Sequence, residues 1–276
     1  MYSGKYPSNL ILKFLKLTWA KKLPQNVKLI FLQDSKNKTY LEGEHLYIDK
    51  SDFNKSLNLV NQRFLKGLLF INNKFSYDLI YKVTTTCYLD IKKLINYSEK
   101  LPQDIYSGQL IHYPPKNKNL EYPQISKNDK SVVYASGSGT FLSKSYIDLI
   151  EKNSHLFKLE HYDDVSLGYF FQELKISPVN SHVENLNYYP KNFELSSDAF
   201  HFRFKLGKFS PLKLPRFLEP LILIKIHLIK NYKNVDQAIK LLYYLYDILA
   251  LYFFRLFLLP RKIINYFFII RKYFFK

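Results

Sequence analysis

The sequence predicts an α/β fold, with a doubly wound, mostly parallel sheet followed by a basic, aromatic helical extension. Within residues 10–101, short apolar segments typical of strands alternate with longer segments of helical periodicity. Gly207 is the last glycine, and the composition shifts beyond it. We therefore expect two parts, a folded domain over residues 1–207 and a helical segment over residues 208–276.

The elements of the N-terminal part follow from periodicity and from the residues that bound each segment. Apolar residues three and four positions apart, with lysines between them, predict an amphipathic helix over residues 10–20. Apolar segments next to Asn, Gln and Asp predict strands over residues 27–32 and 46–48. A longer apolar stripe predicts a helix over residues 53–75, which leads into a central strand, residues 77–83.

Three threonines end the central strand. Thr84, Thr85 and Thr86 place hydroxyl groups at the carboxyl end of a core strand, where open α/β sheets hold their ligands. Asp90 then opens a helix predicted over residues 91–101. This arrangement is typical of one half of a nucleotide site. An ordinary strand-to-helix connection is the alternative.

A glycine-rich segment marks the next part of the chain. The elements predicted around it are two strands, a surface loop and a helix, at residues 106–112, 132–134, 113–130 and 141–157. Between the second strand and the helix, the backbone around Gly137 and Gly139 can approach a phosphate or a sugar closely. A plain tight turn is the alternative, because no third glycine completes a dinucleotide-binding pattern.

Two adjacent aspartates precede a short apolar helix predicted over residues 169–174. Carboxylates at a helix start are stabilised by the helix dipole, so Asp163 and Asp164 can be simple caps. Adjacent side chains point in different directions, so one aspartate can cap while the other acts as a general base. Further on, His201 and Arg203 are predicted to share one side of a strand.

The composition limits the classes of partner. The chain has 276 residues, with 41 Lys and Arg against 23 Asp and Glu, which gives a formal net charge of +18. Such a surplus favours nucleic acid, an anionic membrane face or phosphorylated substrates. Aromatic residues make up 17% of the chain, too many for a disordered basic tail, so most of it should fold.

The C-terminal extension favours a membrane surface among these partners. Residues 217–276 contain 10 basic, 3 acidic and 15 aromatic residues. Helical patterns over residues 241–259 and 261–276 gather basic residues on one side. Charges in and beside the first helix make it a poor spanning segment, so we expect an in-plane amphipathic pair on an anionic leaflet. Packing on the domain or on a second subunit is the alternative, and nucleic acid is not an expected partner.

Cys87 is the only cysteine, so no internal disulfide can form and a reducing compartment is expected. Its place in a strand indicates core packing. The N-terminus shows no basic start followed by an apolar run, so no signal peptide or N-terminal anchor is expected. We therefore expect a cytoplasmic protein that lies peripherally on the inner face of a membrane.

Several short motifs occur in a fixed order over about residues 10–205. The earlier ones are Lys16-Leu-Thr-Trp-Ala, the strand at residues 27–32, the stretch from Asp52-Phe to Asn58-Leu, and Tyr81-Lys-Val-Thr-Thr-Thr-Cys-Tyr-Leu-Asp. The later ones are Tyr134-Ala-Ser-Gly-Ser-Gly-Thr-Phe-Leu-Ser and Asp163-Asp-Val-Ser-Leu-Gly. In this order and spacing, they resemble the motifs of the β-1,3-galactosyltransferase and Fringe-like group of glycosyltransferases.

The resemblance implies a GT-A fold and inverting transfer of a sugar from a nucleotide-diphosphate donor. Lys16 matches a basic position near the donor. Thr84–Thr86 stand where the group has three aspartates that hold a divalent metal on the donor diphosphate. Asp164, with Asp163 beside it, matches the acidic pair that supplies the catalytic base, and His201 matches a histidine that helps to bind the metal.

The threonines are the main departure from the group. Neutral hydroxyls make a weaker site for a hard cation than three carboxylates, so the sequence does not assign a divalent metal such as Mn²⁺ as a cofactor. Either cationic side chains such as Lys82, Lys16 or Arg203 neutralise the leaving diphosphate, or catalysis has been lost and the protein only binds. The resemblance also implies a first strand before residues 3–9, which Met1 and Tyr2 cannot supply, so either the chain starts further upstream or another element fills that edge.

The sequence therefore predicts a glycosyltransferase that moves a hexose or N-acetylhexosamine from a nucleotide-sugar donor, expected to be a UDP-sugar, to a glycan or lipid-linked acceptor. Asp164 is the predicted general base, with Asp163 beside it. The predicted donor contacts are Lys16, Lys82, Thr84, Thr85, Thr86, Ser136, Gly137, Ser138, Gly139 and Arg203. A non-catalytic glycan- or nucleotide-binding relative on the same scaffold is the alternative function.

Overall fold

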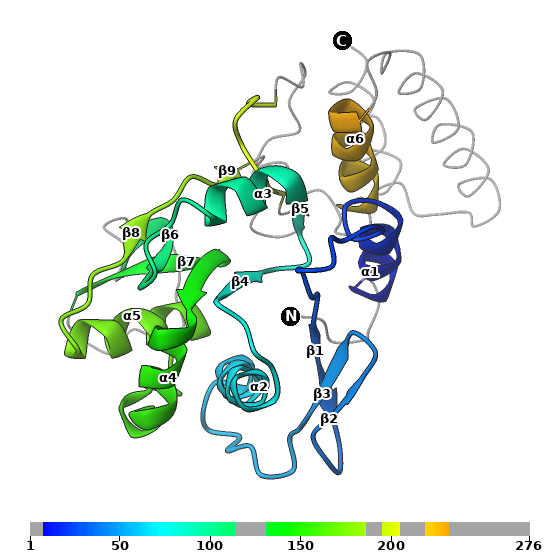
Figure 1. Ribbon diagram of the computed structural model, residues 1–276. Coiled ribbons are helices and arrows are strands. Elements are labelled where there is room, and N and C mark those ends of the chain that lie inside the picture. Colours follow the sequence, from blue (N-terminus) through cyan, green and yellow to red (C-terminus); the bar gives the residue numbers. More distant parts are fainter. Residues whose placement is uncertain (1–7, 114–130, 186–194, 205–218, 232–276) are drawn as a thin grey trace, which may run out of the picture.

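The computed structural model describes residues 8–113, 131–185, 195–204 and 219–231 (Figure 1). Within these residues it is a mixed α/β structure with several sheets. Nearly all of the predicted loop at 113–130, and both helices predicted at 241–259 and 261–276, lie outside the described residues.

A four-stranded sheet forms the centre of the fold. Its strands, in spatial order, are β4 (Leu79–Val83), β7 (Val132–Ser143), β6 (Tyr106–Tyr113) and β8 (Val179–Asn180). Strand β7 is antiparallel to both of its neighbours, and β8 is parallel to β6. The prediction of a mostly parallel, doubly wound sheet is therefore wrong in its strand directions.

Two three-stranded sheets complete the described strands, and each of them is also mixed. The first has the order β1 (Phe31–Ser35), β3 (His45–Asp49) and β2 (Tyr40–Glu42), and the second β5 (Cys87–Leu89), β10 (His201–Arg203) and β9 (Glu184–Asn185). Strands β1 and β3 are parallel, whereas β2 is antiparallel to β3 and β10 is antiparallel to β5. Periodicity did not reveal these directions, because alternating burial is the same in both.

The helices lie close to the predicted segments but differ at their ends. They are α1 (Ser8–Leu17), α2 (Leu59–Lys74), α3 (Ile91–Ser98), α4 (Lys144–Lys152), α5 (Asp163–Glu173) and α6 (Glu219–Asn231), with a short 3₁₀ helix η1 (Ser154–Leu156). Local side-chain caps fix two starts: the side chains of Asn58 and Asp90 accept backbone N–H bonds in the first turns of α2 and α3. The role predicted for Asp90 is thus confirmed.

Two predicted boundaries are wrong for a shared reason. The helix predicted over residues 141–157 begins only at Lys144, because residues 141–143 continue β7. The helix predicted over residues 169–174 already begins at Asp163, so both aspartates lie in its first turn. In each case tertiary packing of fully buried residues overrides the local pattern.

The central sheet has a layer on each face, and its strand β7 is buried along nearly its whole length. Helices α2, α4 and α5 cover one face, and α3 with the β5-β10-β9 sheet lies on the other (Figure 1). Leu142 of β7 packs with Phe64 of α2 and Phe170 of α5. The adjacent Phe141 packs with Phe200 and, through Leu94 of α3, with the opposite layer. This alternation along β7 sets its register, since a slip of one residue would exchange the two faces.

Helix α6 shares an apolar core with the N-terminal helix. Ile222, Leu223 and Ile226 of α6 are buried against Ile11 and Leu15 of α1. No helix among the described residues is both long enough and apolar enough to cross a bilayer. The division of the chain at residue 207 stays a prediction.

Replacing Phe170 tests the core on the α5 side of the sheet. Phe170 is fully buried, so Phe170→Ala should lower the free energy of unfolding by about 3–5 kcal/mol. Urea denaturation followed by circular dichroism measures the change. Leu17→Ala is the control, because Leu17 is 62% exposed and its truncation should cost less than about 0.5 kcal/mol. Equal losses in the two variants would contradict this assignment of the core.

Candidate active site

A long bulge in β7 is the backbone feature on which the candidate site is built. Gly108 of β6 pairs with Thr140, and Leu110 pairs with Ala135, so on the β6 side residues 136–139 of β7 lie opposite a single residue, Gln109. The Thr140 hydroxyl donates to the Ser136 carbonyl at 2.8 Å across the bulge. The glycine-rich segment is therefore a bulge inside a strand, and the alternative of a plain tight turn is wrong.

Asp164 is held against this bulge. The Gly137 N–H donates to Asp164 Oδ2 at 2.9 Å, and the Val165 N–H donates to Oδ1 at 3.0 Å. Burial, and next the neighbouring charge of Asp163, raise the pKa of the Asp164 carboxyl, while Lys82 and the two N–H groups act in the opposite direction. The raised pKa makes this carboxylate a stronger base than a free aspartate.

Asp163 and Lys82 form an ion pair next to Asp164. Lys82 Nζ lies 2.7 Å from Asp163 Oδ2, and both side chains are largely buried. The contact lacks the angles of a good hydrogen bond. Lys82 Nζ also donates to the Gly137 carbonyl at 3.3 Å and lies 5.0 Å from the centre of the Phe64 ring. Lysine, both aspartates and the bulge thus form one connected cluster.

Helix α2 fixes the start of α5, and with it the place of both aspartates. The fully buried Asn61 donates from Nδ2 to Ser166 Oγ at 2.7 Å and to the Lys158 carbonyl at 3.0 Å. Ser166 in turn donates its hydroxyl to the Lys158 carbonyl. Sequence analysis missed Asn61 and Ser166, because hydrogen bonds between distant segments leave no local pattern.

Thr84, Thr85 and Thr86, which follow β4, form what we call the threonine tip. It lies on the side of the bulge away from Asp164. Thr84 Oγ1 is 3.1 Å from Thr86 Oγ1 and 3.3 Å from Cys87 Sγ, and the Cys87 thiol donates to the Ser138 carbonyl at 3.7 Å. Thr85 lies between them and is buried. Burial raises the pKa of the Cys87 thiol to about 11, which fits a thiol that packs in the core. The bulge therefore brings the threonine tip and Asp164 to one stretch of β7.

Two residues outside the predicted set support the tip. Trp19 Nε1 donates to the Cys87 carbonyl at 3.1 Å and ties the end of α1 to β5. The Tyr81 hydroxyl forms a short hydrogen bond with His201 Nδ1. The sequence did contain a signal for Tyr81. It adjoins Lys82 in a strand, and successive strand residues face opposite sides of a sheet, so Tyr81 faces the side opposite to Lys82.

His201 is fully buried against the bulge. A Cβ atom at Gly139 would lie only 2.5 Å from the Tyr81 hydroxyl and 2.7 Å from the His201 ring, so the backbone approach requires glycine. Burial, and next the charge of Arg203, lower the pKa of His201 to about 3, so the ring stays neutral. Within the described residues, its Nε2 has no hydrogen-bond partner.

Lys16 contacts residues outside the predicted site. Its Nζ is 2.7 Å from Glu44 Oε2, 3.5 Å from His45 Nε2 and 5.6 Å from the centre of the Phe31 ring. These contacts join α1 to the β1-β3-β2 sheet. The predicted site thus divides into a main cluster around the bulge and a lysine whose contacts lie elsewhere.

The side chains at the tip do not fit a divalent metal of the kind that the resemblance implies. Such a cation prefers several carboxylate oxygens, whereas the tip offers neutral hydroxyls, of which Thr84 and Thr86 contact each other. His201 could offer only its Nε2, because its Nδ1 is engaged by Tyr81, and one neutral nitrogen does not replace three carboxylates. Nowhere in the described part of the chain do three or more His, Cys, Asp or Glu side chains gather as a metal site would require.

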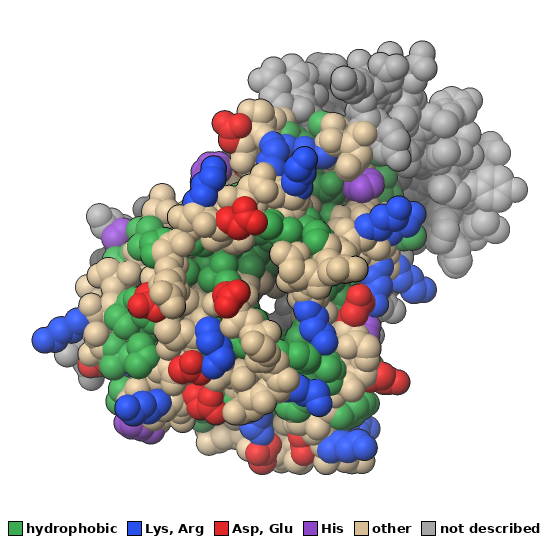
Figure 2. Space-filling model, viewed as in Figure 1, with side chains coloured by type: hydrophobic (Ala, Val, Ile, Leu, Met, Phe, Trp, Pro, Cys, Tyr) green, Lys and Arg blue, Asp and Glu red, His purple; other side chains and the backbone are tan. Residues whose placement is uncertain are grey.

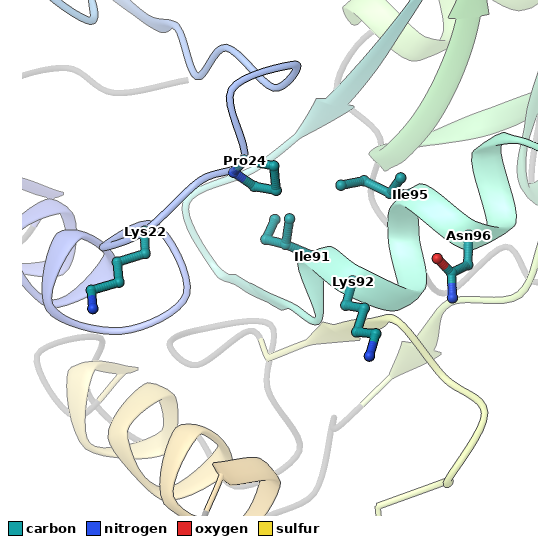
Figure 3. A pocket seen from close by; sticks show the side chains of 6 residues that line it. All are labelled: Lys22, Pro24, Ile91, Lys92, Ile95 and Asn96. Carbon is teal, nitrogen blue, oxygen red and sulfur yellow. The ribbon is translucent and has the colours of Figure 1, made fainter.

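A shallow pocket with a volume of about 400 Å³ lies away from this cluster, between the segment after α1 and helix α3 (Figure 3). The side chains of Pro24, Ile91 and Ile95 face one another in it, and those of Lys22 and Lys92 extend to one side (Figure 3). None of the predicted site residues lines this pocket.

The pocket belongs to a larger basic surface. We define this surface by the lysines of the α1 end, α3 and α6, namely Lys21, Lys22, Lys92, Lys93 and Lys230. Burial is the larger cause of the lowered pKa of both Lys230 and His227. Lys93 also lowers the pKa of Lys230, and Lys21 also lowers that of His227, so the two groups of each pair lie close together. Blue side chains gather over the region of these helices in Figure 2.

The bulge thus has a carboxylate, Asp164, on one side and hydroxyl side chains, Thr84 and Thr86, on the other. The family model described as Galactosyltransferase matches residues 13–182, more than half of the chain. The chain therefore belongs to the galactosyltransferase family, which makes it a hexosyltransferase. Among curated proteins no significant match is found.

The neutral state of His201 gives a pH dependence of stability. Below pH 6.5 the unfolded histidine takes up a proton, whereas the folded one stays neutral down to about pH 3. The free energy of unfolding should therefore fall as the pH drops through this window. In His201→Gln, which cannot titrate, we expect a smaller fall between pH 7 and pH 4 in urea denaturation. Parallel curves for the two proteins would contradict the burial of a neutral ring.

Proposed function

We propose that the protein is an inverting glycosyltransferase of the GT-A type, with Asp164 as its general base. It would transfer a hexose or N-acetylhexosamine from a UDP-sugar to a hydroxyl group of a glycan or glycolipid. Family membership supports nucleotide-sugar-dependent transfer. The observation that carries the assignment of the base is the hydrogen bond from the Gly137 N–H to Asp164 Oδ2.

The mechanism follows from the contacts of Asp164. Each carboxylate oxygen accepts one backbone N–H and keeps a lone pair for an acceptor hydroxyl. The hydroxyl oxygen attacks the anomeric carbon as its proton passes to Asp164. The bond between that carbon and the phosphate oxygen breaks, and the nucleoside diphosphate leaves on the opposite face of the sugar. A raised pKa favours this proton transfer, since the strength of a general base grows with its pKa.

The bulge and the tip supply the groups for the donor. The backbone around Ser136, Gly137, Ser138 and Gly139 would border the sugar, where glycine allows close approach. The hydroxyls of Thr84–Thr86 would bond to the diphosphate or ribose oxygens. Asp163, in its ion pair with Lys82, would position Asp164 rather than take the proton itself.

Asp164→Asn tests the base. The amide oxygen can still accept the Gly137 N–H, so the fold and UDP binding should be kept. We expect kcat to fall about 10²- to 10⁴-fold, because an amide cannot take a proton at neutral pH. Release of UDP measured with a panel of UDP-sugars and acceptors gives kcat, and calorimetry gives the affinity for UDP.

The outcomes of this test also separate the alternative function. Asp163→Asn is the matched variant, and it should reduce kcat less than Asp164→Asn does. Unchanged turnover in Asp164→Asn would remove the base. A wild-type protein that binds UDP but turns over no donor would be the non-catalytic relative instead.

We further propose that the protein works peripherally on the cytoplasmic face of a membrane, where it would meet a lipid-linked acceptor. The basic surface supports this proposal, because its lysines flank the apolar side chains of Pro24, Ile91 and Ile95. Lys22 and Lys92 line the pocket itself, whereas the carboxylates of Asp90, Glu184 and Asp198 act on Lys230. Helix α6 also leads from this surface into the predicted amphipathic pair.

Vesicle sedimentation tests the membrane proposal. The full chain should bind vesicles that contain phosphatidylglycerol more tightly than vesicles of phosphatidylcholine alone, and added salt should weaken the binding. The double variant Lys92→Glu and Lys93→Glu should lose at least about tenfold in affinity, because each lysine near an anionic surface contributes about 1 kcal/mol. Reversal of Lys144 and Lys152 on α4 is the charge-matched control and should change little.

A further inference from the structure

Departure of a nucleoside diphosphate requires a positive charge at the place where negative charge develops. Sequence analysis offers Lys16, Lys82 and Arg203 for this role without choosing between them. Their contacts in the structure differ in a way that allows a choice.

The two lysines are already neutralised by carboxylates. Lys82 Nζ lies 2.7 Å from Asp163 Oδ2, on the aspartate side of the bulge. Lys16 Nζ lies 2.7 Å from Glu44 Oε2, against the β1-β3-β2 sheet. A diphosphate would have to compete with an existing partner at either position.

Arg203 stands directly beside the threonine tip. Strand β10 is antiparallel to β5, with Arg203 opposite Cys87. The Phe204 N–H donates to the Thr86 carbonyl at 2.9 Å and fixes this register. Since opposite residues of an antiparallel pair point to the same face, Arg203 shares the face from which the Cys87 thiol contacts Thr84 and Ser138.

The Arg203 guanidinium has no carboxylate partner in the part of the chain that the structure describes. Among the described residues, no ion pair joins it to an Asp or Glu, and its buried Nε has no hydrogen-bond acceptor. The side chain is half-buried, so part of it can still reach a ligand. A buried cationic donor without an acceptor is costly, which indicates that a ligand completes it.

The pKa shifts of two neighbours agree with this position. The charge of Arg203 lowers the pKa of the Cys87 thiol, against the larger opposing effect of burial. It also adds to burial in lowering the pKa of His201. The positive charge therefore lies near both the threonine tip and His201, the two places that the resemblance associates with a metal.

We infer that the Arg203 guanidinium takes the place of the divalent metal and binds the diphosphate of the donor directly. Arginine suits this role because its planar fork can hold two phosphate oxygens at once. The role of Arg203 depends on the neutral threonines. Three carboxylates at residues 84–86 would pair with Arg203 and neutralise it, whereas three hydroxyls leave its charge available. This inference deepens the proposed function and rests on it.

The test measures binding of UDP to the full chain by calorimetry, in EDTA and in Mn²⁺, with uridine as a ligand that lacks phosphate. The wild type should bind UDP with equal affinity in both buffers. Arg203→Gln should weaken UDP binding about 10- to 100-fold and leave uridine binding unchanged, as expected for loss of a charge-assisted bond. The affinity of Arg203→Lys for UDP should lie between that of the wild type and that of Arg203→Gln. Lys144→Gln, which removes the same charge from an exposed site, should bind like the wild type.

Loss of UDP binding in EDTA, or wild-type binding in Arg203→Gln, would overturn the inference. Thermal denaturation checks that each variant folds. If Arg203→Gln does not fold, Thr84→Asp replaces it: the new carboxylate should pair with Arg203 and weaken UDP binding in EDTA, and unchanged binding would refute the role of Arg203. Turnover that EDTA abolishes would refute the inference but keep the proposed function. If UDP binds through Arg203 without metal but no donor is turned over, the inference is kept and the proposed function is refuted.

Discussion

The candidate site depends on one irregularity, the bulge that β7 forms opposite Gln109. Gly139 stays paired with Val83 of β4, but in a regular strand residues 136–138 would also pair with β6 through their N–H and C=O groups. The bulge frees these groups: the Gly137 N–H reaches Asp164 on one side, and the Ser138 carbonyl reaches Cys87 on the other. Gly108 makes the bulge sterically feasible, because a Cβ at this position would lie 2.5 Å from the Gly139 carbonyl oxygen. Three segments distant in sequence thus meet on four residues.

Charge balance gives the site its chemical character. Asp163 is paired with Lys82, whereas Asp164, within the residues described, has no cation as direct partner and accepts backbone N–H groups. Burial and the charge of Asp163 raise the pKa of Asp164. On the other side of the bulge the polar groups are neutral, except for Arg203. In the proposed mechanism, the general base and the phosphate-binding groups are thus separated by a single bulged strand segment.

Sequence analysis located the motifs well but not the geometry that joins them. The threonine tip, the aspartate pair and the capped helix after Asp90 are visible because each depends on a few adjacent residues. The strand directions, the bulge and the bond between Tyr81 and His201 depend on segments that meet only in the fold. Lys16 is an example of what the motifs alone do not show. Its motif resembles that of the glycosyltransferase group, where a basic residue lies near the donor, yet Lys16 forms an ion pair with Glu44 against the β1-β3-β2 sheet.

The packing of α6 on α1 has a consequence for synthesis of the chain. The apolar face of α1, which includes Ile11 and Leu15, is covered by a helix that begins at Glu219, about 200 residues later. At about 5–20 residues per second, the ribosome needs some 10–40 s to deliver that cover. During this time Tyr88 and Leu89 of the same core are already made, but the α6 side of α1 stays uncovered, and such an apolar surface is a natural substrate for chaperones.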